Sequence, residues 1–190
     1  MADLFPARSP LAAIETVEVA DPGVVFTERR PLRALHVAGL RAGDGAKTAA
    51  RAFGLAELPA PNRSAGGDAR RMLWIAPQTW LLVGSDVMAA TLPFMVVADV
   101  SGAWAAIRAN GPSVRRVLAT TCTLDLHSAV FQVGHCAQTR MAQVGVLLDR
   151  PAGTDTFDLY VARSYAVALL EWLAEAAAYH GCAVRSAQQP

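Results

Sequence analysis

The same order of expected elements occurs twice along the chain. In each half a short strand ends at a glycine turn, a helix follows, and a linker then leads to a hairpin and a second helix. The two copies span Leu32 to about Phe94 and Trp104 to Tyr179. Hairpins pair neighbouring strands in antiparallel fashion, and a helix with one apolar stripe covers a sheet face. The sequence therefore predicts an α+β fold of two pseudo-repeated lobes of antiparallel sheet, with helices on one face of each lobe.

The first copy is defined by turn and cap residues. A strand around Leu35 ends at Gly39, and a helix over Asp44–Phe53 has Asp44 as its N-cap and Gly54 as its stop. The polar loop Pro59–Arg71 then separates this helix from two apolar runs. The Pro77-Gln78 dipeptide between them indicates a hairpin turn. The two runs of this hairpin are Met72–Ala76 and Thr79–Val83.

The second copy has clearer periodicity. Trp104–Ala109 is a strand candidate, and Ser113–Ala119 carries apolar residues at helical spacing. Apolar residues alternate from Ala142 to Leu148 and again from Phe157 to Val161, which predicts an amphipathic hairpin with one face buried. The closing helix is expected over Ser164–Tyr179.

These elements divide the chain into three parts. Residues 1–31 are interrupted by four prolines and are expected to form an irregular N-terminal arm. Residues 32–98 make the first lobe and residues 99–190 the second. The continuous apolar run Met95–Ala98 precedes the boundary and is typical of a strand buried on both faces.

Charge and cysteine usage exclude several classes of protein. The 17 Lys and Arg residues balance the 16 Asp and Glu residues to a net charge of +1. This near-neutral balance argues against a nucleic-acid partner, which requires clustered cations, and against a polybasic membrane surface. Uncharged runs reach 14 residues, in Met72–Ser85 and Leu126–Thr139, too few to span a bilayer. An N-terminus without signal-peptide features and an odd number of cysteines indicate a cytoplasmic protein with reduced thiols.

Reactive constellations are weak in this sequence. Cys136 with His127 or His135 supplies two members of a nucleophilic triad, but no hydrolase or cysteine-protease signature surrounds them. No two His or Cys residues have the spacing at which one helical turn or knuckle grips a metal ion. We therefore predict no catalytic residue, no metal site and no cofactor site in this chain.

Seven segments, taken in order, resemble the gamma subunits of heterotetrameric sarcosine oxidases. The resemblance runs from about Leu32 to about Ala178, and its most specific part is Cys122 to Thr139. The segments are Asn62–Arg63, Trp74–Leu82, Asp99–Ser101, Asn110–Pro112, Cys122–His127, Phe131–Thr139 and Val161–Ala166.

The resemblance implies a function within a complex. Enzymes of this family oxidatively demethylate sarcosine to glycine, release peroxide and can pass the one-carbon unit to tetrahydrofolate. It implies alpha and beta chains that hold FAD, FMN, NAD and the tetrahydrofolate site, and a delta chain that holds zinc. The gamma chain resembles the aminomethyltransferase fold and is expected to be non-catalytic and without a cofactor. Its partners would be the alpha, beta and delta subunits.

For such a subunit we expect the contact region in the arm before Leu32 and in the linker Leu124–Gln138, whose mixed polar and apolar residues lack periodicity. Residues proposed for partner contact or as family-motif positions come from both lobes. They are Trp80, Asp99, Ser101, Leu124, Asp125, His127, Phe131, Gly134, Cys136 and Gln138.

An alternative is a stand-alone folate-binding protein of the aminomethyltransferase-like superfamily. Asp99, at the end of the central strand, would then be the residue to contact folate. Cys136 resembles the cysteine of the folate-binding proteins that maintain iron–sulfur clusters, but the sequence around it is Gly134-His135-Cys136-Ala137 in place of their motif.

Overall fold

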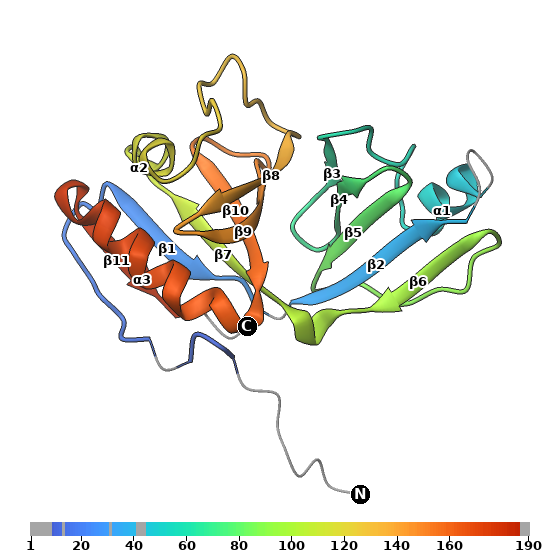
Figure 1. Ribbon diagram of the computed structural model, residues 1–190, viewed down its shortest axis with the longest axis horizontal. Coiled ribbons are helices and arrows are strands. Elements are labelled where there is room, and N and C mark those ends of the chain that lie inside the picture. Colours follow the sequence, from blue (N-terminus) through green and yellow to red (C-terminus); the bar gives the residue numbers. More distant parts are fainter. Residues whose placement is uncertain (1–8, 13, 31, 41–44, 187–190) are drawn as a thin grey trace, which may run out of the picture.

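The computed structural model describes residues 9–12, 14–30, 32–40 and 45–186. Two sheets form two lobes that lie side by side, with helices on their outer sides (Figure 1). The first sheet has five strands in the order β3-β4-β5-β2-β6 and the second has six in the order β11-β1-β7-β10-β9-β8. The predicted α+β fold of two antiparallel lobes is confirmed, with one parallel pair, β1 and β11.

The strands of the first lobe are β2 (Arg33–Gly39), β3 (Ser64–Gly66), β4 (Arg71–Ala76), β5 (Thr79–Gly84) and β6 (Met95–Asp99). The strands of the second lobe are β1 (Val24–Glu28), β7 (Trp104–Asn110), β8 (Cys136–Met141), β9 (Val144–Asp149), β10 (Thr156–Ala162) and β11 (Cys182–Arg185). The helices are α1 (Ala46–Ala52), α2 (Val114–Thr121) and α3 (Ala166–Ala177), and single 3-10 turns cover Ser101–Ala103, Arg163–Tyr165 and Ala178–His180.

Three apolar clusters hold these layers together. One lies between the six-stranded sheet and the helices α2 and α3, and another between the five-stranded sheet and α1. The third joins the helix-free faces of the two sheets: Leu73 and Leu81 from the first lobe contact Leu147 and Tyr160 from the second. Each sheet is therefore covered by helices on its outer face and by the other sheet over part of its inner face.

The N-terminal arm prediction was wrong for its last residues. Val24–Glu28 form β1, which lies between β11 and β7 inside the six-stranded sheet. Val24 and Phe26 are fully buried against the helices of the second lobe. Burial in a sheet formed by distant strands thus outweighs the local proline signal.

The predicted second-lobe hairpin exists, but more of it is buried than predicted. Strand β10 is buried from Phe157 to Val161, and Asp158 and Tyr160 have no exposed surface. The prediction of one buried face was wrong because the other face packs against the first lobe. The linker prediction was also wrong at its end, since Cys136–Met141 form β8, paired with β9.

The run Met95–Ala98 forms β6, and only Met95 in it is buried. The prediction of a strand buried on both faces was wrong because β6 is the edge of its sheet, with 46% of Val96 exposed. The expected helix after the first hairpin is also missing, since the described residues 85–94 contain no helix. Helix α1 is shorter than predicted, and its predicted N-cap Asp44 lies outside the described residues.

Candidate functional site

An exposed apolar surface lies on the helix-free face of β2 and β6. Side chains alternate between the faces of a strand. Val37 packs towards α1, so its neighbours His36 and Ala38 face the other way. Because Ala38 pairs with Val96 and His36 with Ala98, these four side chains share one face, which we call the open face. Val96 and Ala98 are exposed, and His36 and Ala38 are half-buried.

The end of this strand pair adds more apolar surface. The N–H of Leu40 donates to the carbonyl of Phe94 at 2.8 Å, so the two residues are adjacent. Leu40 is 65% exposed and Phe94 49% exposed. Contiguous exposed apolar surface on a small protein commonly marks a site of protein contact. The open face and its end are therefore a candidate docking surface.

A groove of about 360 Å³ continues on the same face of the five-stranded sheet, where the two lobes meet. Ile75 of β4 forms one wall, and Trp104 and Leu147 of the second lobe form the other. The side-chain amide of Gln138 donates a hydrogen bond to the carbonyl of Ile75 across the groove. The groove is thus lined mainly by apolar side chains and bridged by one polar contact.

A buried ion pair fixes the two lobes to each other. The guanidinium of Arg71 in β4 binds the carboxylate of Asp149 in β9, and both side chains are almost fully buried. Arg71 also donates to the carbonyls of Gly66 at 2.8 Å and Arg150 at 3.2 Å, and Ser64 donates to Asp149. Burial alone would lower the pKa of Arg71, but the hydrogen bonds and charge of Asp149 raise it. The Arg71 guanidinium therefore stays charged, and its hydrogen bonds give the pair a fixed direction.

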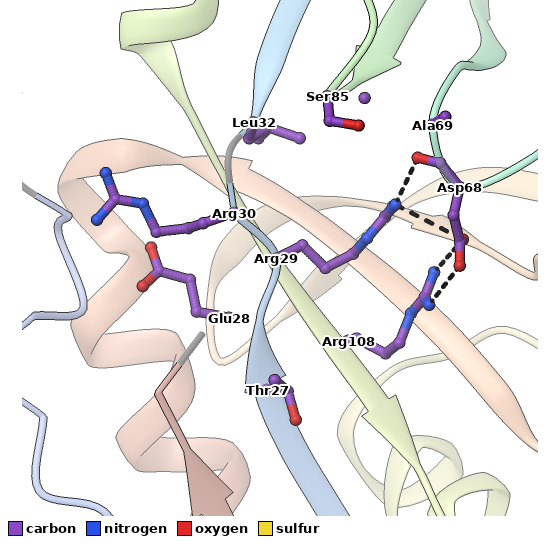
Figure 2. Close-up of a pocket in the computed structure, with 10 residues that line it drawn as sticks. Thr27, Glu28, Arg29, Arg30, Leu32, Asp68, Ala69, Ser85 and Arg108 are labelled. Carbon is purple, nitrogen blue, oxygen red and sulfur yellow. Dashed lines mark hydrogen bonds and ion pairs between the residues drawn. The ribbon is translucent and has the colours of Figure 1, made fainter. Parts of the chain in front are cut away.

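A second ionic cluster lies beside a surface cavity of about 500 Å³ (Figure 2). Arg29 and Arg108 both contact Asp158, at 2.8 Å each, and both converge on Asp68 of the first lobe. Arg29 also donates to the hydroxyl of Tyr160 at 3.0 Å. Hydrogen bonding from Arg108 lowers the pKa of Asp68, although burial opposes this. The two arginines balance the charge of the two aspartates, so this cluster is a second ionic contact between the lobes.

The backbone makes a third connection between the lobes. Arg63 and His135 form an isolated antiparallel bridge. The N–H of Ser64 donates to Gly134 at 2.8 Å, and the N–H of Cys136 donates to Asn62 at 3.0 Å. The edge strand β3 is thereby covered by the segment that leads into β8.

The structure separates the predicted contact residues into several places. The indole N–H of Trp80, on the α1 side of its sheet, donates to the carbonyl of Pro59 at 2.8 Å. Asp99 accepts hydrogen bonds from Ser101 at 2.6 and 2.9 Å and contacts Arg33 at 3.1 Å. Hydrogen bonds from Ser101, together with Arg33, lower the pKa of Asp99. The Asp99 carboxylate is therefore occupied within the chain.

The linker residues lie on the second lobe, away from the open face. Leu124 is half-buried against the helix-covered core. The exposed side chains of Asp125 and His127 accept hydrogen bonds from the backbone N–H groups of His127 and Ala129, at 2.9 and 3.3 Å. Phe131 is buried and its ring stacks on Phe157 with centroids 6.2 Å apart. Most of these side chains thus stabilise the linker itself.

The last three predicted residues lie at the lobe junction. Gly134 has a positive φ of 81° and accepts the hydrogen bond from Ser64. Cys136 is 1% exposed, and its thiol lies 3.1 Å from the carbonyl of Arg63. Burial, then the charge of Asp149, raise the pKa of Cys136 to about 12. A thiol with so little thiolate at neutral pH is a poor nucleophile. Of Gly134, Cys136 and Gln138, only Gln138 reaches the groove.

Sequence reasoning missed the interlobe ionic residues. Arg71 begins and Asp149 ends a buried apolar strand, and Asp158 lies within one. A charged residue in or bordering such a run is unusual unless it is paired, so this placement was the available signal. The described residues contain no group of three or more His, Cys, Asp or Glu side chains arranged to hold a metal ion. None of the described helices has the length and hydropathy needed to cross a membrane.

Comparisons with known proteins agree on one family. The model of the family described as "Sarcosine oxidase, gamma subunit family" matches residues 41–179. The sarcosine oxidase subunit gamma of Corynebacterium sp. (strain U-96) is 29% identical over 187 residues, covering 90% of this chain and 88% of that protein. These matches confirm the resemblance found in the sequence.

Two solved structures share the fold. A chain of the heterotetrameric sarcosine oxidase from Corynebacterium sp. U-96, in complex with pyrrole 2-carboxylate, matches with a TM-score of 0.78 and 24% identity, covering 92% of this chain and 96% of that one. The glycine cleavage system aminomethyltransferase T of Bartonella henselae matches with a TM-score of 0.59 and 13% identity, covering 87% of this chain and 48% of that one. The aminomethyltransferase-like architecture is thus confirmed.

Proposed function

Because the chain belongs to the sarcosine oxidase gamma subunit family, we propose that it is a non-catalytic structural subunit of a heterotetrameric sarcosine oxidase. The complex would oxidatively demethylate sarcosine to glycine, form peroxide and transfer the one-carbon unit to tetrahydrofolate. The observation that carries this proposal is the family match over residues 41–179, most of both lobes. We further propose that the complex is cytoplasmic.

The partners in this proposal are the alpha, beta and delta subunits. We assign FAD, FMN, NAD and the tetrahydrofolate site to the alpha and beta chains and zinc to the delta chain, as the family resemblance implies. The gamma chain would place these larger chains relative to one another and help to enclose a reactive one-carbon intermediate away from water.

Two features of the chain support a structural part in the complex. Its buried polar side chains are largely used for internal contacts: Arg71 with Asp149, and Arg29 and Arg108 with Asp158. Its largest exposed apolar side chains are spread over both lobes and include a contiguous group at the open face. A rigid body with an apolar surface suits subunit contact.

The proposal is tested by coexpressing the chain with the other three subunits and measuring sarcosine-dependent peroxide formation. We expect the tagged chain to recover all three partners in constant proportion, and peroxide formation to fall when the chain is omitted. Unchanged assembly and activity without it would refute a structural role.

A titration separates this function from stand-alone folate binding, the alternative raised by the sequence. The isolated chain is titrated with tetrahydrofolate by calorimetry, with Asp99→Asn as the matched variant. We expect no saturable heat from either protein. Saturable binding that Asp99→Asn abolishes would favour the alternative.

A further inference from the structure

We propose that β6 is a docking edge, and that an extended, acidic and apolar segment of a partner subunit pairs with it along the open face. This inference rests on the proposed function, since the partner is another chain of the same complex. It differs from the sequence-based expectation, which placed the contacts in the arm and in the linker Leu124–Gln138.

The backbone of β6 presents free hydrogen-bonding groups outwards. In an antiparallel pair, residues alternate between exchanging hydrogen bonds with the partner strand and pointing their groups away from it. The N–H of Val100 donates to Ala34 and the N–H of Leu40 donates to Phe94, each at 2.8 Å. The pairs Ala34–Val100 and Leu40–Phe94 are therefore hydrogen-bonded pairs. Alternation along the strand makes Val37–Val97, which lies between them, a pair that exchanges no hydrogen bonds. Its N–H and C=O therefore point to the free edge.

The neighbours in the same phase are Met95 and Asp99. The N–H of Met95 already donates to the carbonyl of Leu92 at 3.3 Å, which leaves its C=O. At the other end of β6, the N–H of Asp99 also points to the free edge. Together these groups form the repeat of donors and acceptors that an added strand requires.

The other sheet edges in the described part of the chain are at least partly covered. Strand β3 and the start of β8 cover each other through the Arg63–His135 bridge. Strand β11 is flanked by Val17, which exchanges hydrogen bonds of 2.9 Å with Val184 in both directions. Beyond β6 there is no strand, and Figure 1 shows it at the outer border of the first lobe.

The edge also has little of the usual protection against pairing. Natural edge strands carry a charged residue, a proline or a bulge, or they are very short. The one charged residue of β6 is Asp99 at its end, which is paired with Arg33, and the rest of the strand, Met95 to Ala98, has no charge and no proline. The register of β6 with β2 has no bulge. An exposed apolar edge of this kind is retained when it is covered in the working assembly.

The charges beside the open face define the chemistry of the partner. His36 is the one ionisable side chain that the described residues place on the open face itself. Arg140 follows Gln138 on the same face of β8 and pairs with Gly145, which lines the groove. Its exposed side chain donates to the backbone and side-chain carbonyls of Gln143, at 3.0 and 3.3 Å. The one carboxylate in β2 and β6 is Asp99, which belongs to the opposite face and is paired with Arg33. A complementary segment therefore has apolar side chains over Val96 and Ala98 and an acidic side chain nearby.

The test uses the full-length chain coexpressed with the other subunits of the complex. Val97→Pro removes the outward N–H without breaking a hydrogen bond to β2, and Val97→Thr changes the same side chain while keeping that N–H. Val96→Glu places a carboxylate on the open face. Tyr179→Glu is its control, since Tyr179 is 101% exposed on the other lobe. Each purified variant is first compared with the natural chain by thermal melting.

We expect Val97→Pro and Val96→Glu to have melting temperatures close to that of the natural chain. Both variants should recover at least about tenfold less of the partner subunits, while the controls Val97→Thr and Tyr179→Glu recover normal amounts. Amide hydrogen exchange gives a second readout: the amides of Val97 and Asp99 should become protected only in the complex. Arg140→Glu should also weaken recovery, and more strongly at low salt.

Normal recovery of the partners by both Val97→Pro and Val96→Glu, or unchanged exchange at Val97, would overturn the docking edge and leave the proposed function intact. Doubling of the mass of the natural chain in sedimentation, lost in Val97→Pro while partner recovery is unchanged, would assign the edge to a second copy of this chain and overturn the proposal. Failure of the natural chain to recover any partner would refute both the docking edge and the proposed function.

Discussion

Replacement of Arg71 by methionine tests whether the buried ion pair holds the two lobes together. The substitution keeps most of the side-chain volume but removes the guanidinium. Asp149, with no exposed surface, would then keep only the hydrogen bond from Ser64. Removal of one partner of a buried pair costs about 3–5 kcal/mol, because the remaining charge is left uncompensated.

This magnitude translates into a large shift in melting temperature. For domains of this size, 1 kcal/mol changes the midpoint by about 2–4 °C, so Arg71→Met should lower it by roughly 6–20 °C. The assay is thermal and urea unfolding followed by circular dichroism at pH 7. The double variant Arg71→Met/Asp149→Leu removes the stranded charge and should recover much of the loss.

The pH dependence of the stability loss distinguishes a stranded charge from a packing defect. Burial raises the pKa of Asp149 even in the natural chain, and without Arg71 it rises further. A carboxylate whose pKa is higher in the folded state than in the unfolded state destabilises the fold at higher pH. The deficit of Arg71→Met should therefore shrink as the pH is lowered and Asp149 takes up a proton. A loss below about 1 kcal/mol, or a double variant as unstable as the single one, would refute the reasoning.

Three further predictions concern other parts of the structure. Hydrogen bonding from Arg108 lowers the pKa of Asp68 below 3.8, so its contribution is complete above that pH and is lost as the pH falls through the folded value. Because Asp68 is 65% exposed, Asp68→Asn should cost only about 0.2–1 kcal/mol at pH 7, and melting curves should show no difference in strong acid. Deletion of residues 1–31 removes β1 and should prevent folding, whereas deletion of residues 1–15 should leave a cooperative melt, as circular dichroism can show. At pH 8 the thiol of Cys136, with a pKa of about 12, should contain roughly a thousandfold less thiolate than one at 9.0; iodoacetamide labelling of the native chain that reaches Cys136 as fast as Cys122 or Cys182 would contradict this.

The sequence supplied most of the fold because its elements carry local signals. The hairpin of β4 and β5 turns at the predicted Pro77-Gln78, and Gln78 has a positive φ of 55°. Helix α2 buries its predicted stripe of Val114, Val117 and Leu118. Strands β1 and β11 were missed because they are short and are stabilised by pairing with each other, 158 residues apart between Val24 and Cys182. No local pattern reports such a contact.

Some of the residues predicted for partner contact are buried, because a sequence motif does not distinguish a surface residue from one that packs inside the chain. Phe131 and Cys136 belong to conspicuous segments, yet both are buried within the chain. The apolar run Met95–Ala98 predicts a strand buried on both faces, because apolar periodicity cannot locate a strand within its sheet. Its exposure follows from the order of strands alone, with β2 on one side and no strand on the other.

The interlobe ion pairs have a use beyond stability. A hydrocarbon pair in place of Arg71 and Asp149 could be as stable, but apolar contacts do not fix direction, whereas the Arg71 guanidinium bonds Asp149 and two carbonyls at set angles. The orientation of the lobes determines the shape of the groove between Ile75 and Leu147. A subunit whose role is to place larger chains must itself keep one shape. The buried charges of this chain, Arg71, Asp149 and Asp158, thus lie where they set the angle between the lobes.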